Sequence, residues 1–111
     1  MSISTHVLDA ALGRPAVGLA VRLERVEESG PRLVAAGHTG IDGRLSDWVA
    51  DGELAAGVHR LVFDTGAYHA SAGTPTFYPE VVVTFLVADP AEHHHVPLLL
   101  SPFAYSTYRG S

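Results

Sequence analysis

The chain of 111 residues contains no cysteine and no lysine. Without cysteine there is no disulfide, no zinc-thiolate centre and no thiol nucleophile, so the stability of the fold must come from packing. The basic residues are seven arginines and the formal net charge is -5, which leaves no basic run to neutralise a phosphate backbone. The sequence therefore excludes thiol chemistry and argues against nucleic acid as a partner.

Long apolar runs are also missing. No window approaches the length of a membrane-spanning helix, and the segment Met1 to His6 has no positive region followed by an apolar stretch. We therefore expect a cytoplasmic protein with no membrane partner. Hydrophobic residues make up 47% of the chain and charged residues 17%, a balance that favours a compact globular protein over a disordered one. At this length the composition predicts one domain over residues 1–111.

What the sequence does contain is a set of short segments in which apolar residues alternate with others. The alternation between Val17 and Val26 predicts a strand whose odd positions face the core. It returns at 58–64, where His59, Leu61 and Phe63 share one face. Four more strands are predicted at 32–36, which forms a hairpin with the first strand, and at 81–87, 96–100 and 105–108.

Helical periodicity is almost absent. The small residues of 65–73, closed by Pro75, are the best place for one short helix, whereas residues 37–48 carry turn signals and are expected to form a loop. Strand 96–100 is apolar enough that we expect both of its faces to be covered. Many short strands between Gly and Pro turns are typical of an all-β antiparallel sandwich.

Three consecutive histidines, His93, His94 and His95, are the most unusual polar feature of the chain. Because side chains alternate along a strand, His93 and His95 are predicted to share one face and His94 to point to the other. An imidazole with a pKa near 6.5 suits proton transfer at neutral pH, and a neighbouring cation favours its neutral, basic form. Solvated residues at a strand end, or a metal site that also uses His6, explain the same pattern. The cluster alone therefore does not decide the function.

Covalent catalysis has no support in the sequence. None of Ser4, Ser101, Ser106 and Ser111 lies in a nucleophile-elbow pattern, and no Gly-rich phosphate loop is present. A mechanism in which histidine and arginine activate water needs only residues already present.

Three segments together resemble the transthyretin-like hydrolases that open the ring of 5-hydroxyisourate. The first is residues 4–16, which begins Ser-Thr-His-Val-Leu-Asp, and the second is Thr-Gly-Ile-Asp-Gly-Arg at 39–44. The third and most specific is residues 93–111, which ends Tyr-Arg-Gly-Ser. The departures are small: His94 stands where an aromatic residue is usual, and Ala104 where glycine is common.

The resemblance implies a transthyretin-like β-sandwich of two sheets with one short helix. The implied activity is hydrolysis of 5-hydroxyisourate to 2-oxo-4-hydroxy-4-carboxy-5-ureidoimidazoline in urate (purine) catabolism, without cofactor or metal. The implied assembly is a homotetramer, a dimer of dimers. The implied substrate-binding residues are His6, Arg44, His95, Tyr108, Arg109 and Ser111, of which the first three form the catalytic set.

A transthyretin-like carrier of small ligands, without catalysis, is the alternative from another class. In transthyretin the His and Arg positions hold other residues and the final Tyr-Arg-Gly-Ser is lost, so their retention here favours the enzyme. In the enzyme, His6 or His95 takes a proton from the attacking water, and the sequence leaves open which of them does so. Arg44 or Arg109 then holds the planar substrate and offsets charge on its carbonyl oxygen.

Overall fold

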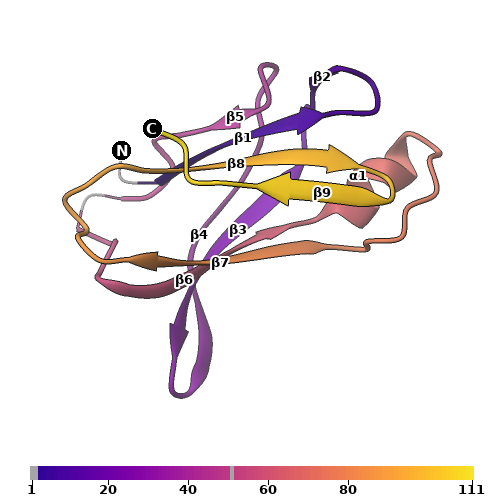
Figure 1. Cartoon of the computed structure of the whole chain (residues 1–111). Helices are drawn as coiled ribbons and strands as arrows, with labels where there is room; N and C mark the ends of the chain where they lie inside the picture. Colours follow the sequence, from indigo (N-terminus) through magenta and orange to yellow (C-terminus); the bar gives the residue numbers. More distant parts are fainter. Residues whose placement is uncertain (1–2, 51) are drawn as a thin grey trace.

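The protein is a two-layer β-sandwich with one short helix at the end of the sheets (Figure 1). The computed structural model describes residues 3–50 and 52–111. One sheet has the order β2-β1-β8-β9, with β5 also paired to β1, and the other has the order β4-β3-β6-β7. The elements are β1 (Ile3–Asp9), β2 (Arg14–Pro15), β3 (Ala20–Glu27), β4 (Gly30–His38), β5 (Arg44–Leu45), β6 (Gly57–Phe63), α1 (Thr65–Ser71), β7 (Val81–Val87), β8 (His94–Ser101) and β9 (Ala104–Thr107).

The alternation in the sequence places the core between the sheets. On β6, His59, Leu61 and Phe63 are each 0% exposed, which confirms the face predicted for that strand. Burial of these apolar side chains is the main source of stability in a fold without disulfides. The other buried apolar residues include Ile3, Val7, Leu19, Val21, Leu23, Val81, Val87, Val96, Leu98 and Leu100, drawn from both sheets.

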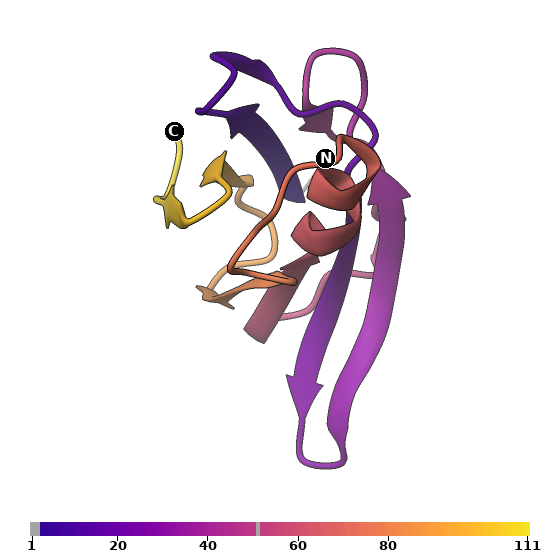
Figure 2. The same cartoon turned by 90° about the vertical axis from the view of Figure 1, so that its right-hand side faces the viewer.

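The predicted hairpin is confirmed, but its first strand begins later than the alternation indicated. Val17 is 53% exposed and Gly18 has a φ of 74°, so the chain turns there and β3 begins only at Ala20. The β3–β4 hairpin then extends well beyond the rest of the sandwich (Figure 2). The first part of the predicted strand was therefore wrong, because a turn glycine interrupts an apolar pattern that continues through it.

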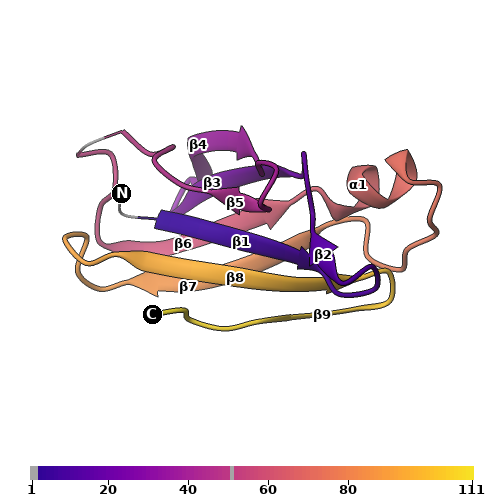
Figure 3. The same ribbon diagram turned by 90° about the horizontal axis from the view of Figure 1, so that it is seen from above.

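The first sheet differs from the prediction in its strands and in their pairing. No strand was predicted over β1 or β2. Strands β1 and β8 lie side by side and run parallel, whereas the sequence predicted antiparallel pairing throughout (Figure 3). The predicted loop 37–48 contains β5, whose Arg44 and Leu45 pair with His6 and Thr5 of β1. A strand of two residues is too short to show a period, so the sequence could not reveal it.

The predicted helix is confirmed as α1. The Asp64 side chain accepts a hydrogen bond from the backbone N–H of Ala67 and caps the first turn. The Tyr68 hydroxyl donates to the buried carboxylate of Asp9 at 2.7 Å, which fastens the helix to β1. Among residues 3–50 and 52–111, no helix has the length and apolar character that crossing a membrane requires.

Candidate active site on the outer face of β1 and β8

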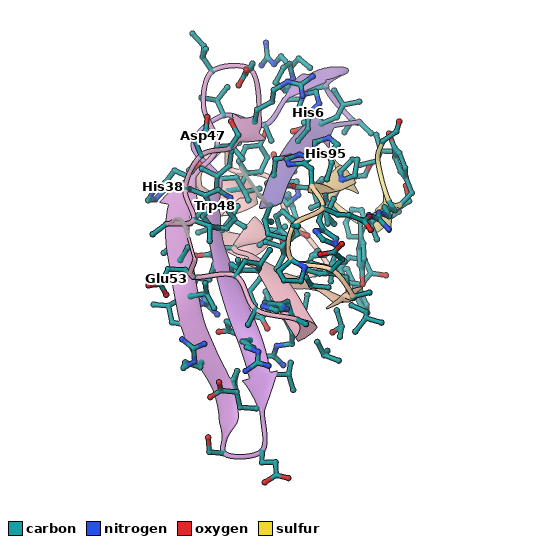
Figure 4. All side chains as sticks on the ribbon, turned by 90° about the vertical axis from the view of Figure 1, so that its left-hand side faces the viewer. His6, His38, Asp47, Trp48, Glu53 and His95 are labelled. Atoms are coloured by element: carbon teal, nitrogen blue, oxygen red, sulfur yellow. The ribbon has the colours of Figure 1, made fainter. Side chains whose placement is uncertain are left out.

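The outer face of the first sheet carries polar side chains from β1 and β8. In the parallel register Ser4 lies opposite His95, and His6 lies opposite Pro97. Residues in register share a face, so His6 is a diagonal neighbour of His95. Figure 4 shows these two histidines close together and apart from His38 on the other sheet. The pairing of β1 with β8 thus brings together residues that lie far apart in the sequence.

Strand β5 brings Arg44 to the same place. Arg44 pairs with His6, and its Nε lies 4.0 Å from the Asp42 carboxylate. Both side chains of this ion pair are more than half exposed, so the guanidinium remains available to a ligand. The preceding Gly43 has a φ of 78°, and a Cβ there would lie 2.5 Å from the Val7 carbonyl oxygen. The Asp-Gly-Arg turn therefore requires glycine at this position for Arg44 to reach β1.

The imidazole of His6 has a fixed orientation. Its Nε2 lies 3.0 Å from the carbonyl oxygen of Asp42. Because a carbonyl oxygen only accepts, Nε2 carries the proton and donates, and in the neutral ring the lone pair is on Nδ1. The same turn that presents Arg44 therefore also sets the tautomer of His6.

The prediction that His94 points to the opposite face from His93 and His95 is confirmed. His94 points into the sandwich and is 5% exposed, whereas His93 and His95 both point outward and meet at one hydroxyl. The Ser4 Oγ lies 2.7 Å from Nδ1 of His95 and 2.9 Å from Nε2 of His93. Ser4 itself is 8% exposed. The two outward histidines are therefore joined through a nearly buried serine.

The pKa of His95 is lowered from its ordinary value of 6.5. Partial burial is the largest cause, since it disfavours the charged form. The positive charge of Arg44 and the neighbouring His93 and His6 lower the pKa further. At neutral pH the His95 ring is therefore the uncharged form, which can accept a proton.

A small pocket opens on this face, and a second cavity lies on the other side of His95. The pocket has a volume of about 170 Å³ and the cavity about 280 Å³, and His95 borders both. The pocket is lined by Ser4, Thr5, Arg44, Ser46, Asp47, His93 and His95. The larger cavity is mostly apolar and is lined by Val83, Phe85, Leu86, His94, His95, Val96, Thr107, Tyr108 and Arg109.

The remaining site residues predicted from the sequence lie beside this cavity or at the chain end. Tyr108 is 60% exposed, and Arg109 forms an ion pair with Glu92 at 3.2 Å. Ser111 is exposed, and the preceding Gly110 donates its N–H to the carbonyl oxygen of His95 at 2.8 Å. Within one chain the fold thus gathers His6, Arg44 and His95 in one group, and Tyr108 and Arg109 line the larger cavity that His95 also borders.

The metal-site alternative gains no support. Among residues 3–50 and 52–111, no group of three or more His, Asp or Glu side chains has the arrangement of a metal site. His93 and His95 instead share the Ser4 hydroxyl. The described donors therefore do not form a ligand set for a metal or for a cofactor that depends on one.

Sequence reasoning missed Ser4 and Asp42. Ser4 was considered only as a nucleophile, and its contact with His93 and His95 depends on a strand pairing that periodicity does not reveal. Asp42 acts on His6 through its backbone carbonyl, which every residue has. The spacing of Ser4 and His6 could have shown that they share one face of a strand. It could not have shown which strand lies beside them.

The chain is similar in sequence and in structure to several known proteins. The profile of the HIUase/Transthyretin family matches residues 3–110. The chain is 48% identical to "5-hydroxyisourate hydrolase 2" of Rhizobium meliloti, covering 98% of this chain and 95% of that protein. The structure of Klebsiella pneumoniae 5-hydroxyisourate hydrolase has a TM-score of 0.87 at 35% identity and full coverage of both chains. Sea bream transthyretin in complex with thyroxine has a TM-score of 0.92 at 32% identity, covering 99% and 95%.

Proposed function

The chain belongs to the HIUase/Transthyretin family, and on that premise we propose that it is an enzyme that hydrolyses 5-hydroxyisourate. The product is 2-oxo-4-hydroxy-4-carboxy-5-ureidoimidazoline, in urate catabolism. The name 5-hydroxyisourate hydrolase is carried by relatives that are 41–48% identical over 98% of this chain. The observation that carries the proposal is the meeting of His6, Arg44 and His95 on one outer sheet face.

His95 is the general base in this proposal. Each ring has one nitrogen engaged, Nε2 of His6 by the Asp42 carbonyl and Nδ1 of His95 by the Ser4 hydroxyl. Of the two rings, His95 is the one that lines the pocket with Arg44. The Nε2 atom of His95 is then the atom that takes a proton from water as the water oxygen attacks the ring carbonyl carbon. Such a base contributes roughly 10²- to 10⁴-fold to the rate. The lowered pKa of His95 keeps it ready for this step at neutral pH.

Arg44 stabilises the charge that develops on the carbonyl oxygen. Its planar guanidinium offers forked donors that fit an oxygen-rich substrate, and an exposed side chain at the pocket can reach the ligand. His6, one diagonal step from His95, orients the substrate. Tyr108, Arg109 and Ser111 complete the substrate-binding set.

We propose that the working form is a homotetramer, a dimer of dimers. Strands β7 and β9 are both at sheet edges, and several large apolar side chains are exposed in the single chain. Apolar exposure of this kind marks surfaces that associate. Sedimentation of the purified protein is expected to give four chains per particle, and a monomer at working concentration would contradict this proposal. The exposed apolar side chains include Leu12, Ile41, Phe77, Leu86, Phe103 and Tyr105.

A carrier of small aromatic ligands is the second candidate. The likeness to the sea bream transthyretin complex with thyroxine favours it, since the two folds superpose over nearly their whole length. A carrier needs a channel but no base, so it gives no role to a neutral His95 beside Arg44. Tight binding of thyroxine without any hydrolysis of 5-hydroxyisourate would favour the carrier.

The deciding experiment measures hydrolysis directly. Purified protein is added to 5-hydroxyisourate generated freshly from urate by urate oxidase, and the loss of 5-hydroxyisourate absorbance is compared with the spontaneous rate. We expect a loss that is proportional to the amount of protein, and a rate equal to the spontaneous one would overturn the proposal.

A cytoplasmic location also stays a prediction, which cell fractionation with an antibody against the chain tests.

A further inference from the structure

Ser4 occupies a position that the proposed reaction does not yet explain. Its Oγ is within hydrogen-bond distance of two imidazole nitrogens, Nδ1 of His95 at 2.7 Å and Nε2 of His93 at 2.9 Å. Its residue is 8% exposed, so water has little access to compete for these bonds. The three side chains therefore form a continuous chain from the partly buried His95 to the exposed His93, and all three line the pocket.

The chemistry of a hydroxyl allows two arrangements in which the Ser4 proton lies between the two rings. A serine hydroxyl has one proton to donate and accepts through its oxygen lone pairs. When both imidazoles are neutral, Ser4 donates to His93 and accepts from His95, or the reverse. If Ser4 instead accepts from both rings, its own proton points to neither of them and no relay can run. In the first arrangement Nδ1 of His95 carries the proton and Nε2 has the lone pair. In the second arrangement Nε2 of His95 carries the proton, so this atom cannot act as a base.

Resting on the proposed function, we propose that Ser4 is a positioning residue that holds His95 as the Nε2 base and passes a proton from His95 to His93. In this arrangement Ser4 donates to Nε2 of His93 and accepts from the Nδ1 proton of His95. The hydroxyl keeps the same orientation when Nε2 of His95 gains a proton. No reorientation is needed before the proton is taken from water, as preorganised catalysis requires. The relay step itself then reverses both hydrogen bonds of Ser4.

The proton transfers balance without any other reactant. Nε2 of His95 takes a proton from water as the water oxygen bonds to the carbonyl carbon. The Nδ1 proton of His95 then moves to the Ser4 oxygen as the Ser4 proton moves to Nε2 of His93. His95 is neutral again with its proton on Nε2, and His93 is an imidazolium. The same steps run in reverse when Nε2 of His95 gives its proton to the departing nitrogen.

The surroundings favour His93 over His95 as the site of the positive charge. His95 is partly buried and faces the charge of Arg44, with His6 nearby, and these lower its pKa. His93 is exposed, so its ring has more contact with solvent than the partly buried ring of His95. The relay therefore moves charge from the less favourable to the more favourable environment.

The tautomer of His95 is measured by ¹⁵N–¹H correlation of the imidazole nitrogens at pH 7.5, without substrate. The wild-type protein is expected to show a proton on Nδ1 and a lone pair on Nε2 of His95. In Ser4→Ala the pattern is expected to shift toward a proton on Nε2, because the acceptor at Nδ1 is gone. His93→Gln is expected to keep the wild-type pattern, since the amide oxygen can still accept from Ser4.

Steady-state kinetics of the variants distinguish the positioning role of Ser4 from its role in proton transfer. We expect Ser4→Ala to lower kcat roughly 100-fold with little change in KM, because a wrong histidine tautomer removes the base. Ser4→Thr retains the hydroxyl and is expected to restore most of kcat. His93→Gln keeps the tautomer but cannot take the proton, and about a tenfold loss of kcat is expected. Ser29→Ala, in the exposed turn between β3 and β4, is the matched control and is expected to match the wild type.

The results that would overturn the role of Ser4 differ from the result that would overturn the proposed function. A wild-type His95 with its proton on Nε2, or a tautomer unchanged in Ser4→Ala, would overturn the positioning role. Failure of Ser4→Thr to restore kcat, or normal kcat in His93→Gln, would overturn the relay. If the wild-type protein does not act on 5-hydroxyisourate, the proposed function fails, while the nitrogen spectra still decide the arrangement around Ser4.

Discussion

The backbone of Gly110 and the ring of His95 are in close contact. Gly110 donates its N–H to the carbonyl oxygen of His95 at 2.8 Å, and the two residues form an isolated β-bridge. A Cβ at Gly110 would lie 2.5 Å from Cδ2 of the His95 ring. The chain end thus leaves no room for a side chain beside the ring, and the ring is held between Gly110 and Ser4.

Gly110→Ala is expected to displace the His95 ring and to lower kcat about 10- to 100-fold, because catalytic groups tolerate little misplacement. The substitution lies outside the core, so the melting temperature is expected to stay within a few degrees of the wild type. Steady-state kinetics and thermal unfolding of the same sample check both parts. Unchanged kcat would show that the ring position does not depend on this contact.

His95→Asn is expected to reduce kcat at least roughly 100-fold, since it removes the base while keeping a polar side chain of similar reach. His38→Asn is the matched control, because His38 is an exposed residue of β4 on the other sheet. Both variants are expected to fold and to sediment as the wild type does. Near-normal turnover by His95→Asn would remove His95 from the mechanism.

The acid limit of activity follows from the pKa of His95. Burial, together with Arg44, His93 and His6, lowers this pKa below its ordinary value of 6.5. The base form is neutral, so kcat/KM is expected to stay on its plateau as the pH falls past 6.5 and to decrease only at lower pH. A profile of kcat/KM from pH 5 to 8 measures this. An acid limb centred at 6.5 or above contradicts the assignment.

His59 predicts how stability depends on pH. The ring is 0% exposed, its Nδ1 lies 3.0 Å from the Gly57 carbonyl oxygen, and its buried Nε2 has no partner among the described residues. Its pKa is lowered, first by burial and then by Arg25, Arg32 and His94, despite the Gly57 contact that raises it. The unfolded chain therefore binds the proton more readily than the folded one.

The free energy of unfolding is consequently expected to be highest above pH 6.5 and to decrease as the pH falls below the unfolded pKa. It levels off once the pH is below the folded pKa of His59. The slope from this group is at most about 1.4 kcal/mol per pH unit. Denaturant unfolding of the wild type and of His59→Phe at pH 7.5 and 5.0 checks this. An equal loss of stability in both proteins would show that His59 does not cause it.

The sequence predicted which face each side chain takes better than it predicted which strands are neighbours. Alternation correctly assigned His59, Leu61 and Phe63 to the core, and it correctly separated His94 from His93 and His95. These results follow from the geometry of a single strand. The expectation of cover on both faces of 96–100 holds for the inner face, whereas on the outer face Leu99 is 36% exposed in the single chain.

The candidate site depends on pairings that a single strand does not encode. His6 and His95 become neighbours only because β1 runs parallel to β8, and Arg44 joins them only through the two-residue strand β5. Long-range pairing is set by the combined packing of both sheets, which periodicity does not report. The resemblance of three separate segments to one family supplied the grouping of His6, Arg44 and His95 that periodicity could not provide.

The parallel register of β1 and β8 has a consequence for how folding errors affect this protein. A slip of one residue would turn Ile3 and Val7 out of the core, and the loss of burial makes such a structure unstable. A slip of two residues keeps every side chain on its own face and therefore has a much smaller packing cost. It would nevertheless move Ser4 away from His95. Catalytic activity, rather than stability, is then the property that distinguishes the correctly aligned strand from a misaligned but well-packed one.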